Sequence, residues 1–78
     1  MSRYIKDFAY DHVLDMRGVL IRRLAIALDG RRDTQSVVAE ELRVSPTTIS
    51  NIENLHYKRM SLQMLILLCL RLGVNYSA

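Results

Sequence analysis

The sequence predicts an all-α fold, a compact domain of four to five helices. Apolar residues recur at helical spacing along the chain, and no segment alternates apolar and polar residues as a half-buried strand does. Only one proline and three glycines interrupt the 78 residues. With 50% hydrophobic residues, a chain of this length can build one core without disulfides or metal. We therefore expect residues 1–78 to form a single domain.

The first part of the chain is expected to hold one long helix. Apolar residues recur at helical spacing from about Asp11 to Leu28, and Asp29 with Gly30 supplies a stop signal. Residues 1–10 carry three large apolar side chains, which predict either a short amphipathic helix or an arm that packs on the body: Tyr4, Ile5 and Phe8.

Three further helices are predicted from their start signals. Three hydroxyl residues can each accept a hydrogen bond from an orphan backbone N–H at a helix start: Thr34, Ser45 and Ser61. Pro46 suits the first position of its helix because the missing N–H would be unpaired there anyway. The helices are expected over residues 34–42, 46–54 and 61–72. Gly73 suits the left-handed conformation that ends the last one.

The helix over 34–42 is expected to turn one face inward, with a small residue beside it that allows close packing. That face consists of Val37, Val38, the aliphatic stem of Glu41 and Leu42, next to Ala39.

Composition and charge limit the cellular compartments and the kinds of binding partner to be expected. The net charge of +3 and the isoelectric point near 9.4 suit a polyanionic partner and are also common among small soluble domains. The single Cys69 allows no disulfide framework within the chain, which is typical of a reducing cytosol. The longest apolar run, Met64 to Leu70, is far too short for a membrane span, and Asp7 and Asp11 interrupt any signal peptide. We expect a cytoplasmic protein without a membrane partner.

The residues that catalysis or metal binding would require are missing from the sequence. There is no glycine-rich phosphate loop, no carboxylate pair in an apolar pocket and no nucleophile beside a base. His12 and His56 have no further ligand at metal-binding spacing. We therefore expect that the protein is not an enzyme and binds neither a cofactor nor a metal ion.

The most informative pattern lies between residues 34 and 54. Only Arg43 and Val44 separate Leu42 from Ser45, so the two helices that flank them must meet at a sharp angle. Five apolar residues should face the shared core: Ala39, Leu42, Val44, Ile49 and Ile52. Four short polar residues are left on the other face of the second helix: Thr47, Thr48, Ser50 and Asn51. This is the geometry of a helix-turn-helix.

An ordered series of residues across four helices resembles the phage repressor/Cro (Xre-type) helix-turn-helix family and its lambda-repressor-like fold. The series covers about half of the chain and comprises Thr34-Gln35, Ala39, Leu42, Val44-Ser45, Ile49-Ser50, Ile52-Glu53-Asn54, Ser61-Leu62, Leu65, Leu68 and Leu72-Gly73-Val74. The longer N-terminal part also resembles the variant found in antitoxins of the higA type.

The resemblance implies a regulator that binds double-stranded DNA, with a role for each matching position. The base-contacting residues would be Thr47, Ser50 and Asn51. By the same resemblance, Gln35 and Thr48 would contact phosphate. Three further phosphate contacts are expected from position and charge: Arg43 in the turn, where this chain departs from the family, and Lys58 and Arg59 just after the reading helix. An Asn amide pairs with the N6/N7 edge of adenine and a Thr methyl meets the thymine methyl, so we expect a preference for A·T-containing steps.

Two further implications concern single positions. Arg43 stands where the family often has Gly, which predicts a left-handed residue at a cost of roughly 1 kcal/mol. Glu53 stands where the family has a Glu that usually pairs with an arginine of the first helix, but the sequence assigns neither Arg22 nor Arg23 as its partner, and Glu53 is interpreted as a structural residue.

The last helix predicts a symmetric homodimer. Its inward positions should be Leu62, Leu65, Leu68, Cys69 and Leu72, which leaves an outward stripe of Gln63, Ile66, Leu67 and Leu70. Burial of Ile66, Leu67 and Leu70 on a two-fold mate would pair two reading helices about 34–36 Å apart on an inverted-repeat operator. In the alternative, Tyr4, Ile5 and Phe8 cover this stripe within one chain.

A second class of function stays open at this point. The same fold also serves as a protein-interaction module, such as an antitoxin that binds a toxin or a phage protein that binds a host enzyme.

Overall fold

A computed structural model describes residues 15–77, which form four α-helices and one short 3-10 helix, with no strand in that range. In chain order the elements are α2 (Met16–Asp29), α3 (Gln35–Leu42), α4 (Pro46–Glu53), η1 (Tyr57–Arg59) and α5 (Leu62–Leu72). The predicted all-α class is confirmed. The arm expected over residues 1–10, with Tyr4, Ile5 and Phe8, lies outside the described residues.

The capping residues define the helix starts. The side-chain oxygens of Thr34, Ser45 and Ser61 accept hydrogen bonds from the backbone N–H groups three residues later, at 3.4, 3.3 and 3.1 Å. Gly73 ends α5 with a φ of 69°, in the left-handed conformation that glycine adopts without a Cβ penalty. The predicted starts and this stop are confirmed.

The long helix near the N-terminus begins later than predicted. Asp15 has a non-helical backbone, and its side chain accepts a hydrogen bond from the backbone N–H of Arg17 at 3.2 Å. It is therefore the N-cap of α2, and the start expected at Asp11 is wrong. The expected stop is confirmed, because α2 ends at Asp29 with Gly30 as its C-cap.

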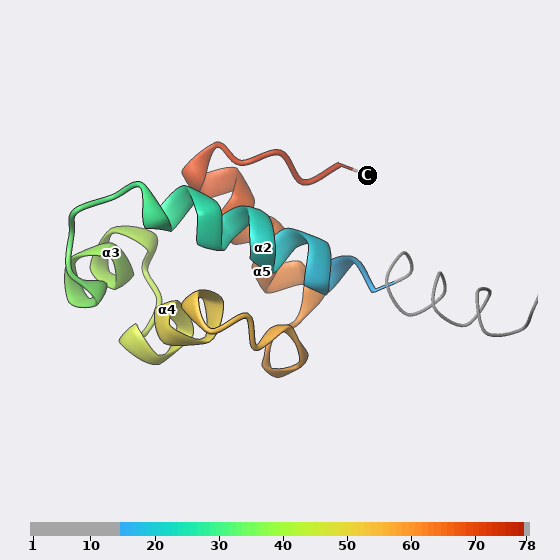
Figure 1. Ribbon diagram of the computed structural model, residues 1–78, viewed down its shortest axis with the longest axis horizontal. Coiled ribbons are helices and arrows are strands. Elements are labelled where there is room, and N and C mark those ends of the chain that lie inside the picture. The colour runs from blue at the N-terminus through green and yellow to red at the C-terminus, as the bar shows by residue number, and fades with distance from the viewer. Residues whose placement is uncertain (1–14, 78) are drawn as a thin grey trace, which may run out of the picture.

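The core lies where α2 crosses the other helices, in contact with α4, α5 and η1 (Figure 1). α3 packs mainly on α4, at the left-hand end of the molecule in this view. The buried side chains are Leu20, Ile21, Leu24, Leu28, Val38, Ala39, Leu42, Ile49, Ile52, Met60, Leu65, Leu68 and Cys69. Burial raises the pKa of the Cys69 thiol, which favours its neutral form.

Four residues differ from the predicted pattern. Val37 is 50% exposed and Glu41 is exposed, because α3 sits at the edge of the fold and is covered along one narrow stripe only. Leu62 is 41% exposed. It occupies the first position of α5, where a side chain leans toward the N-terminus and beyond the core. Ile66, expected on the outward stripe, is half-buried and packs against the core.

Candidate nucleic-acid interface

The connection between α3 and α4 is a tight left-handed turn. Arg43 adopts φ 61° and ψ 42°, as predicted from the glycine usual at this position. Its neighbour Val44 donates a backbone hydrogen bond to the Ala39 carbonyl at 2.9 Å and packs against the core. The guanidinium of Arg71, on α5, donates to the Leu42 carbonyl at the end of α3. α5 therefore supports the turn that sets the angle between the two helices.

The predicted base-contacting residues share one face of α4. Thr47, Ser50 and Asn51 are spaced i, i+3 and i+4 and so lie side by side. Ile49 and Ile52 occupy the opposite face and are buried. Thr47 is exposed, whereas Ser50 and Asn51 are half-buried. The structure thus brings these three polar residues together on the outward side of α4.

The polar side chains of α4 differ in whether they are already hydrogen-bonded within the protein. The Asn54 side-chain amide donates to the Ser50 carbonyl at 2.9 Å and to the Ser50 hydroxyl at 3.3 Å. The hydroxyl of Thr48 shares a hydrogen bond of 3.1 Å with Ser45, so Thr48 takes part in the helix cap. Among residues 15–77, the Asn51 side chain has no hydrogen-bond partner. Asn51 therefore keeps its full amide for another molecule.

Gln35 lies at the start of α3 and contacts the end of α4. Its Nε2 donates a hydrogen bond to the Glu53 carboxylate. Within residues 15–77 Glu53 forms no ion pair with Arg22 or Arg23, and its bond to Gln35 joins α3 to α4. Arg23 instead donates to the Asn75 and Ser77 carbonyls, at 3.1 and 2.8 Å, and so holds the C-terminal segment along α2.

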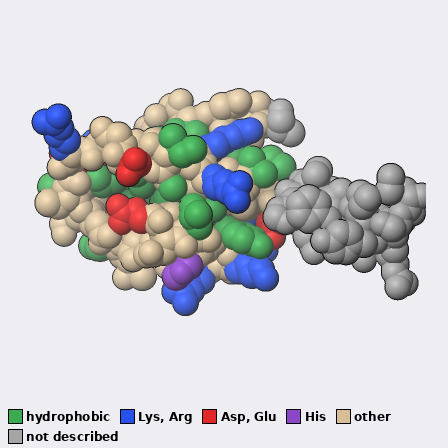
Figure 2. All heavy atoms as spheres, in the orientation of Figure 1, with side chains coloured by type: hydrophobic (Ala, Val, Ile, Leu, Met, Phe, Trp, Pro, Cys, Tyr) green, Lys and Arg blue, Asp and Glu red, His purple; other side chains and the backbone are tan. Residues whose placement is uncertain are grey.

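The cations that follow α4 lie on η1. Lys58 and Arg59 are both exposed. Figure 2 shows Lys, Arg and His side chains gathered along the lower edge of the molecule, on the side where η1 lies in Figure 1. Arg31 differs from them because its guanidinium is paired with Asp33 at 2.9 Å and also with Glu41. Its charge is thus balanced within the protein.

The start of α2 holds η1 in place. The Arg17 guanidinium lies 5.8 Å from the centre of the Tyr57 ring and 3.5 Å from the Met60 carbonyl oxygen that it donates to. Arg17 also pairs with Asp15 at 3.0 Å, and this hydrogen bond lowers the pKa of the Asp15 carboxyl. The position of Lys58 and Arg59 relative to α4 is therefore fixed by contacts from α2.

Sequence reasoning missed three of these features. The Gln35–Glu53 bond and the Arg71 bond to the Leu42 carbonyl join residues far apart in the chain, and no local pattern signals them. Leu55, just after α4, has φ 58°, a conformation that is rare for a bulky residue. Nothing in the sequence marks Leu55 as a left-handed position.

Other kinds of site are absent from the described part of the chain. No group of three or more His, Cys, Asp or Glu side chains within residues 15–77 is arranged to hold a metal ion. Over the same residues, no helix combines the length and apolar character needed to cross a membrane.

The two short helices, the left-handed turn and the outward polar face of α4 define a helix-turn-helix protein. Residues 22–77 match the sequence model of a family described as Helix-turn-helix. The match covers more than half of the chain, which belongs to this Xre/lambda-repressor-like helix-turn-helix family of DNA-binding regulators. Neither a curated protein nor a solved structure matches the sequence.

Proposed function

We propose that this protein is a sequence-specific transcriptional repressor that reads the major groove of double-stranded DNA with α4. The observation that carries this proposal is the common outward face of Thr47, Ser50 and Asn51, opposite the buried Ile49 and Ile52. Hydroxyl and amide groups donate to and accept from base edges, and an Asn amide matches the N6/N7 edge of adenine. Because the Asn51 amide has no hydrogen-bond partner within residues 15–77, Asn51 is the principal base-reading residue of this proposal.

Phosphate contacts on both sides of α4 would hold it in the groove. Gln35 lies at the N-terminal end of α3, where the helix dipole and orphan N–H groups favour a phosphate. Lys58 and Arg59 lie beyond the other end of α4 and attract the same backbone by charge. Thr48 and Arg43, at the first turn of α4 and in the tight turn, are the remaining proposed phosphate contacts.

The proposed active form is a homodimer through α5. Leu67 and Leu70, 39% and 56% exposed, form an outward apolar stripe, and Ile66 lies half-buried at its edge. Burying such side chains on a mate contributes about 1.5–3 kcal/mol each before association costs. A single domain of this size reads few base pairs, whereas a two-fold dimer reads an inverted repeat.

Selection of bound DNA from a random pool tests this function. We expect enrichment of an inverted repeat with half-sites about one helical turn apart, roughly 34–36 Å. A mobility-shift titration on the selected site should show a specific complex that weakens as salt rises. The control is the combined Thr47→Ala, Ser50→Ala and Asn51→Ala variant, which keeps the buried face of α4 and should retain only non-specific binding. An unenriched pool would contradict the proposal and favour a protein-interaction module.

A further inference from the structure

The outward side of α2 carries an apolar surface that the proposed function does not use. Ile26 is 74% exposed, the highest value among the large apolar side chains of residues 15–77. Leu55 lies beside it, 43% exposed and in a left-handed conformation. Two shallow hollows, of about 400 and 370 Å³, have Leu55 in common. Strain of this kind persists where the surrounding structure imposes it and is frequent at functional surfaces.

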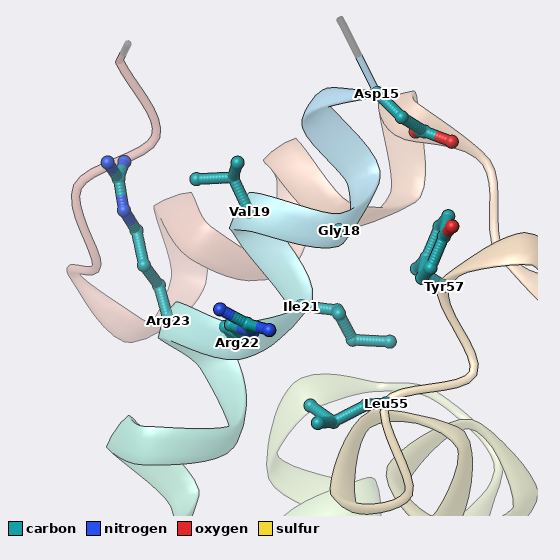
Figure 3. Close-up of a pocket in the computed structure, with 8 residues that line it drawn as sticks. All are labelled: Asp15, Gly18, Val19, Ile21, Arg22, Arg23, Leu55 and Tyr57. Atoms are coloured by element: carbon teal, nitrogen blue, oxygen red, sulfur yellow. The ribbon is translucent and has the colours of Figure 1, made fainter. Parts of the chain in front are cut away.

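The figures show how this surface is built. In Figure 3, Leu55 and Tyr57, from the segment after α4, lie across the larger hollow from α2, which supplies most of the other labelled residues. In Figure 2, hydrophobic side chains extend across the middle of this face, Lys and Arg side chains lie among them toward the right, and Asp and Glu side chains lie to the left of the central hydrophobic ones. Part of this apolar surface therefore lies between basic and acidic side chains.

The charges along α2 follow the same order. Arg22 stands four residues before Ile26, and Asp29 three residues after it, so all three lie on one side of the helix. Both charged side chains point away from the buried residues of α2 and are exposed. Within the part of the chain that the structure describes, neither Arg22 nor Asp29 forms an ion pair. The pattern is a cation, an isoleucine and an anion spread over two helical turns.

We propose that this stripe is a contact between two copies of the chain, with their α2 helices antiparallel around a two-fold axis at Ile26. At 1.5 Å per residue, Arg22 then lies about 6 Å along the helix on one side of the axis and Asp29 about 4.5 Å on the other. Each Arg22 faces the partner's Asp29, and this happens twice because of the symmetry. The two Ile26 side chains meet at the centre and cover the hollow beside Leu55.

The pattern favours a second copy over an unrelated partner because it is complementary to itself. An antiparallel pair converts one Arg, Ile and Asp stripe into two opposite-charge pairs around one apolar contact. The antiparallel arrangement also opposes the two helix dipoles, which favours the pair further. In the parallel arrangement Arg22 would face Arg22 and Asp29 would face Asp29, so like charges would repel.

This contact is small, and we expect it to be weak in solution. It uses none of the residues of the proposed α5 interface. If the proposed function holds, the α2 contact would link dimers bound at neighbouring sites on one DNA molecule, where effective concentration is high. The contact itself does not depend on DNA binding and can be measured without DNA.

Charge reversal tests the contact and its register together. Sedimentation velocity, from about 10 μM to about 1 mM, would compare variants built on Leu67→Glu, which removes the proposed α5 contact. The Leu67→Glu protein should self-associate, and Arg22→Asp or Asp29→Arg should each weaken this association about tenfold. An equimolar mixture of the two reversed variants should associate again as a heterodimer. In that heterodimer the introduced carboxylate faces the introduced guanidinium, and the original pair of Arg22 and Asp29 forms on the other side of the axis.

Matched controls separate this contact from a general effect of charge. Arg32→Asp and Glu40→Arg make the same changes in net charge at exposed positions outside the stripe, and they should leave association unchanged. Ile26→Asp should abolish association without lowering the unfolding temperature, because the side chain is 74% exposed. The proposal is overturned if the Leu67→Glu protein stays monomeric near 1 mM, or if the mixture associates no better than its components.

Discussion

The side-chain amide of Gln35 donates a hydrogen bond to the Glu53 carboxylate, which joins the first residue of α3 to the last residue of α4. A carboxylate only accepts, so this bond determines that the amide nitrogen, and not the oxygen, faces Glu53. The nitrogen carries a second N–H that stays available for a phosphate oxygen, which likewise only accepts. We therefore expect Glu53 to orient Gln35 for the proposed backbone contact.

A double-mutant cycle tests this orientation. Gln35→Ala should weaken DNA binding about fivefold, the value of roughly one hydrogen bond. Glu53→Ala should cause a similar loss, and the double variant should be little worse than either, because each change removes the same contact. Fluorescence-anisotropy titration on one operator gives all four affinities. Additive losses would show that Glu53 does not act through Gln35.

At position 55, glycine should give a more stable protein than alanine, which is the reverse of the order expected inside a helix. The φ of 58° at Leu55 strains any residue with a Cβ, so Leu55→Gly should be more stable than Leu55→Ala by about 1 kcal/mol in urea unfolding. Exposed Ile26, in the middle of α2, is the matched control. There the alanine variant should be more stable than the glycine variant by about 0.5–1 kcal/mol. A more stable alanine variant at position 55 would contradict the argument from strain.

Asp15 combines a helix cap with an ion pair, and two substitutions separate them. Asp15→Asn keeps an oxygen for the Arg17 N–H but loses the charge, whereas Asp15→Ala loses both and should cost about 1 kcal/mol. Because the folded-state pKa lies below its ordinary value of 3.8, the charge stabilises the fold above that value.

The stabilisation by the Asp15 charge is lost as pH falls through 3.8 toward the lower folded-state pKa. Urea unfolding between about pH 5 and pH 2 should therefore show a steeper loss of stability for the parent than for Asp15→Asn. Parallel curves would mean that the Asp15 charge does not stabilise the fold.

Leu67 tests the dimer. A charge in the apolar stripe of α5 should give a folded protein that is monomeric at low micromolar concentration, where the weak α2 contact does not form, and that has strongly reduced operator affinity, because the new carboxylate would have to be desolvated at the interface. The matched control is Val37→Glu on α3, since Val37 is an exposed apolar residue, 50% exposed, that lies outside the α5 stripe. It should remain dimeric. Sedimentation equilibrium at micromolar concentration provides the measurement, and a monomeric parent would contradict the proposed α5 interface.

The starts of α3, α4 and α5 and the turn between α3 and α4 were predictable because their signals are local. Hydroxyl residues at Thr34, Ser45 and Ser61 cap the backbone three residues on, and the short connection around Arg43 requires a tight turn. Periodicity overestimated the buried faces of α3 and α5. Periodicity identifies the apolar side of a helix, but the packing of neighbouring helices determines how much of that side is buried. Val37 and Leu62 lie on such sides and are exposed.

For the site, the sequence predicts which residues share a face of α4, but it does not predict the hydrogen bonds between helices. The spacing of Thr47, Ser50 and Asn51 along one helix follows from the sequence, and their roles on DNA stay predictions. The bond between Gln35 and Glu53, 18 positions apart, follows only from how α3 packs on α4. Leu55 shows the same limit, because tertiary packing imposes a backbone conformation that its side chain disfavours.

The most direct test of base reading by α4 is the affinity of Asn51→Ala for a panel of single-base operator variants. The variant should lose about 1–3 kcal/mol of discrimination at one base position and keep the parent's profile at the others. Arg59→Ala, measured in parallel, should weaken binding to every sequence alike and reduce the salt slope by about 1. A profile for Asn51→Ala identical to the parent's at every position would contradict the reading role of this helix.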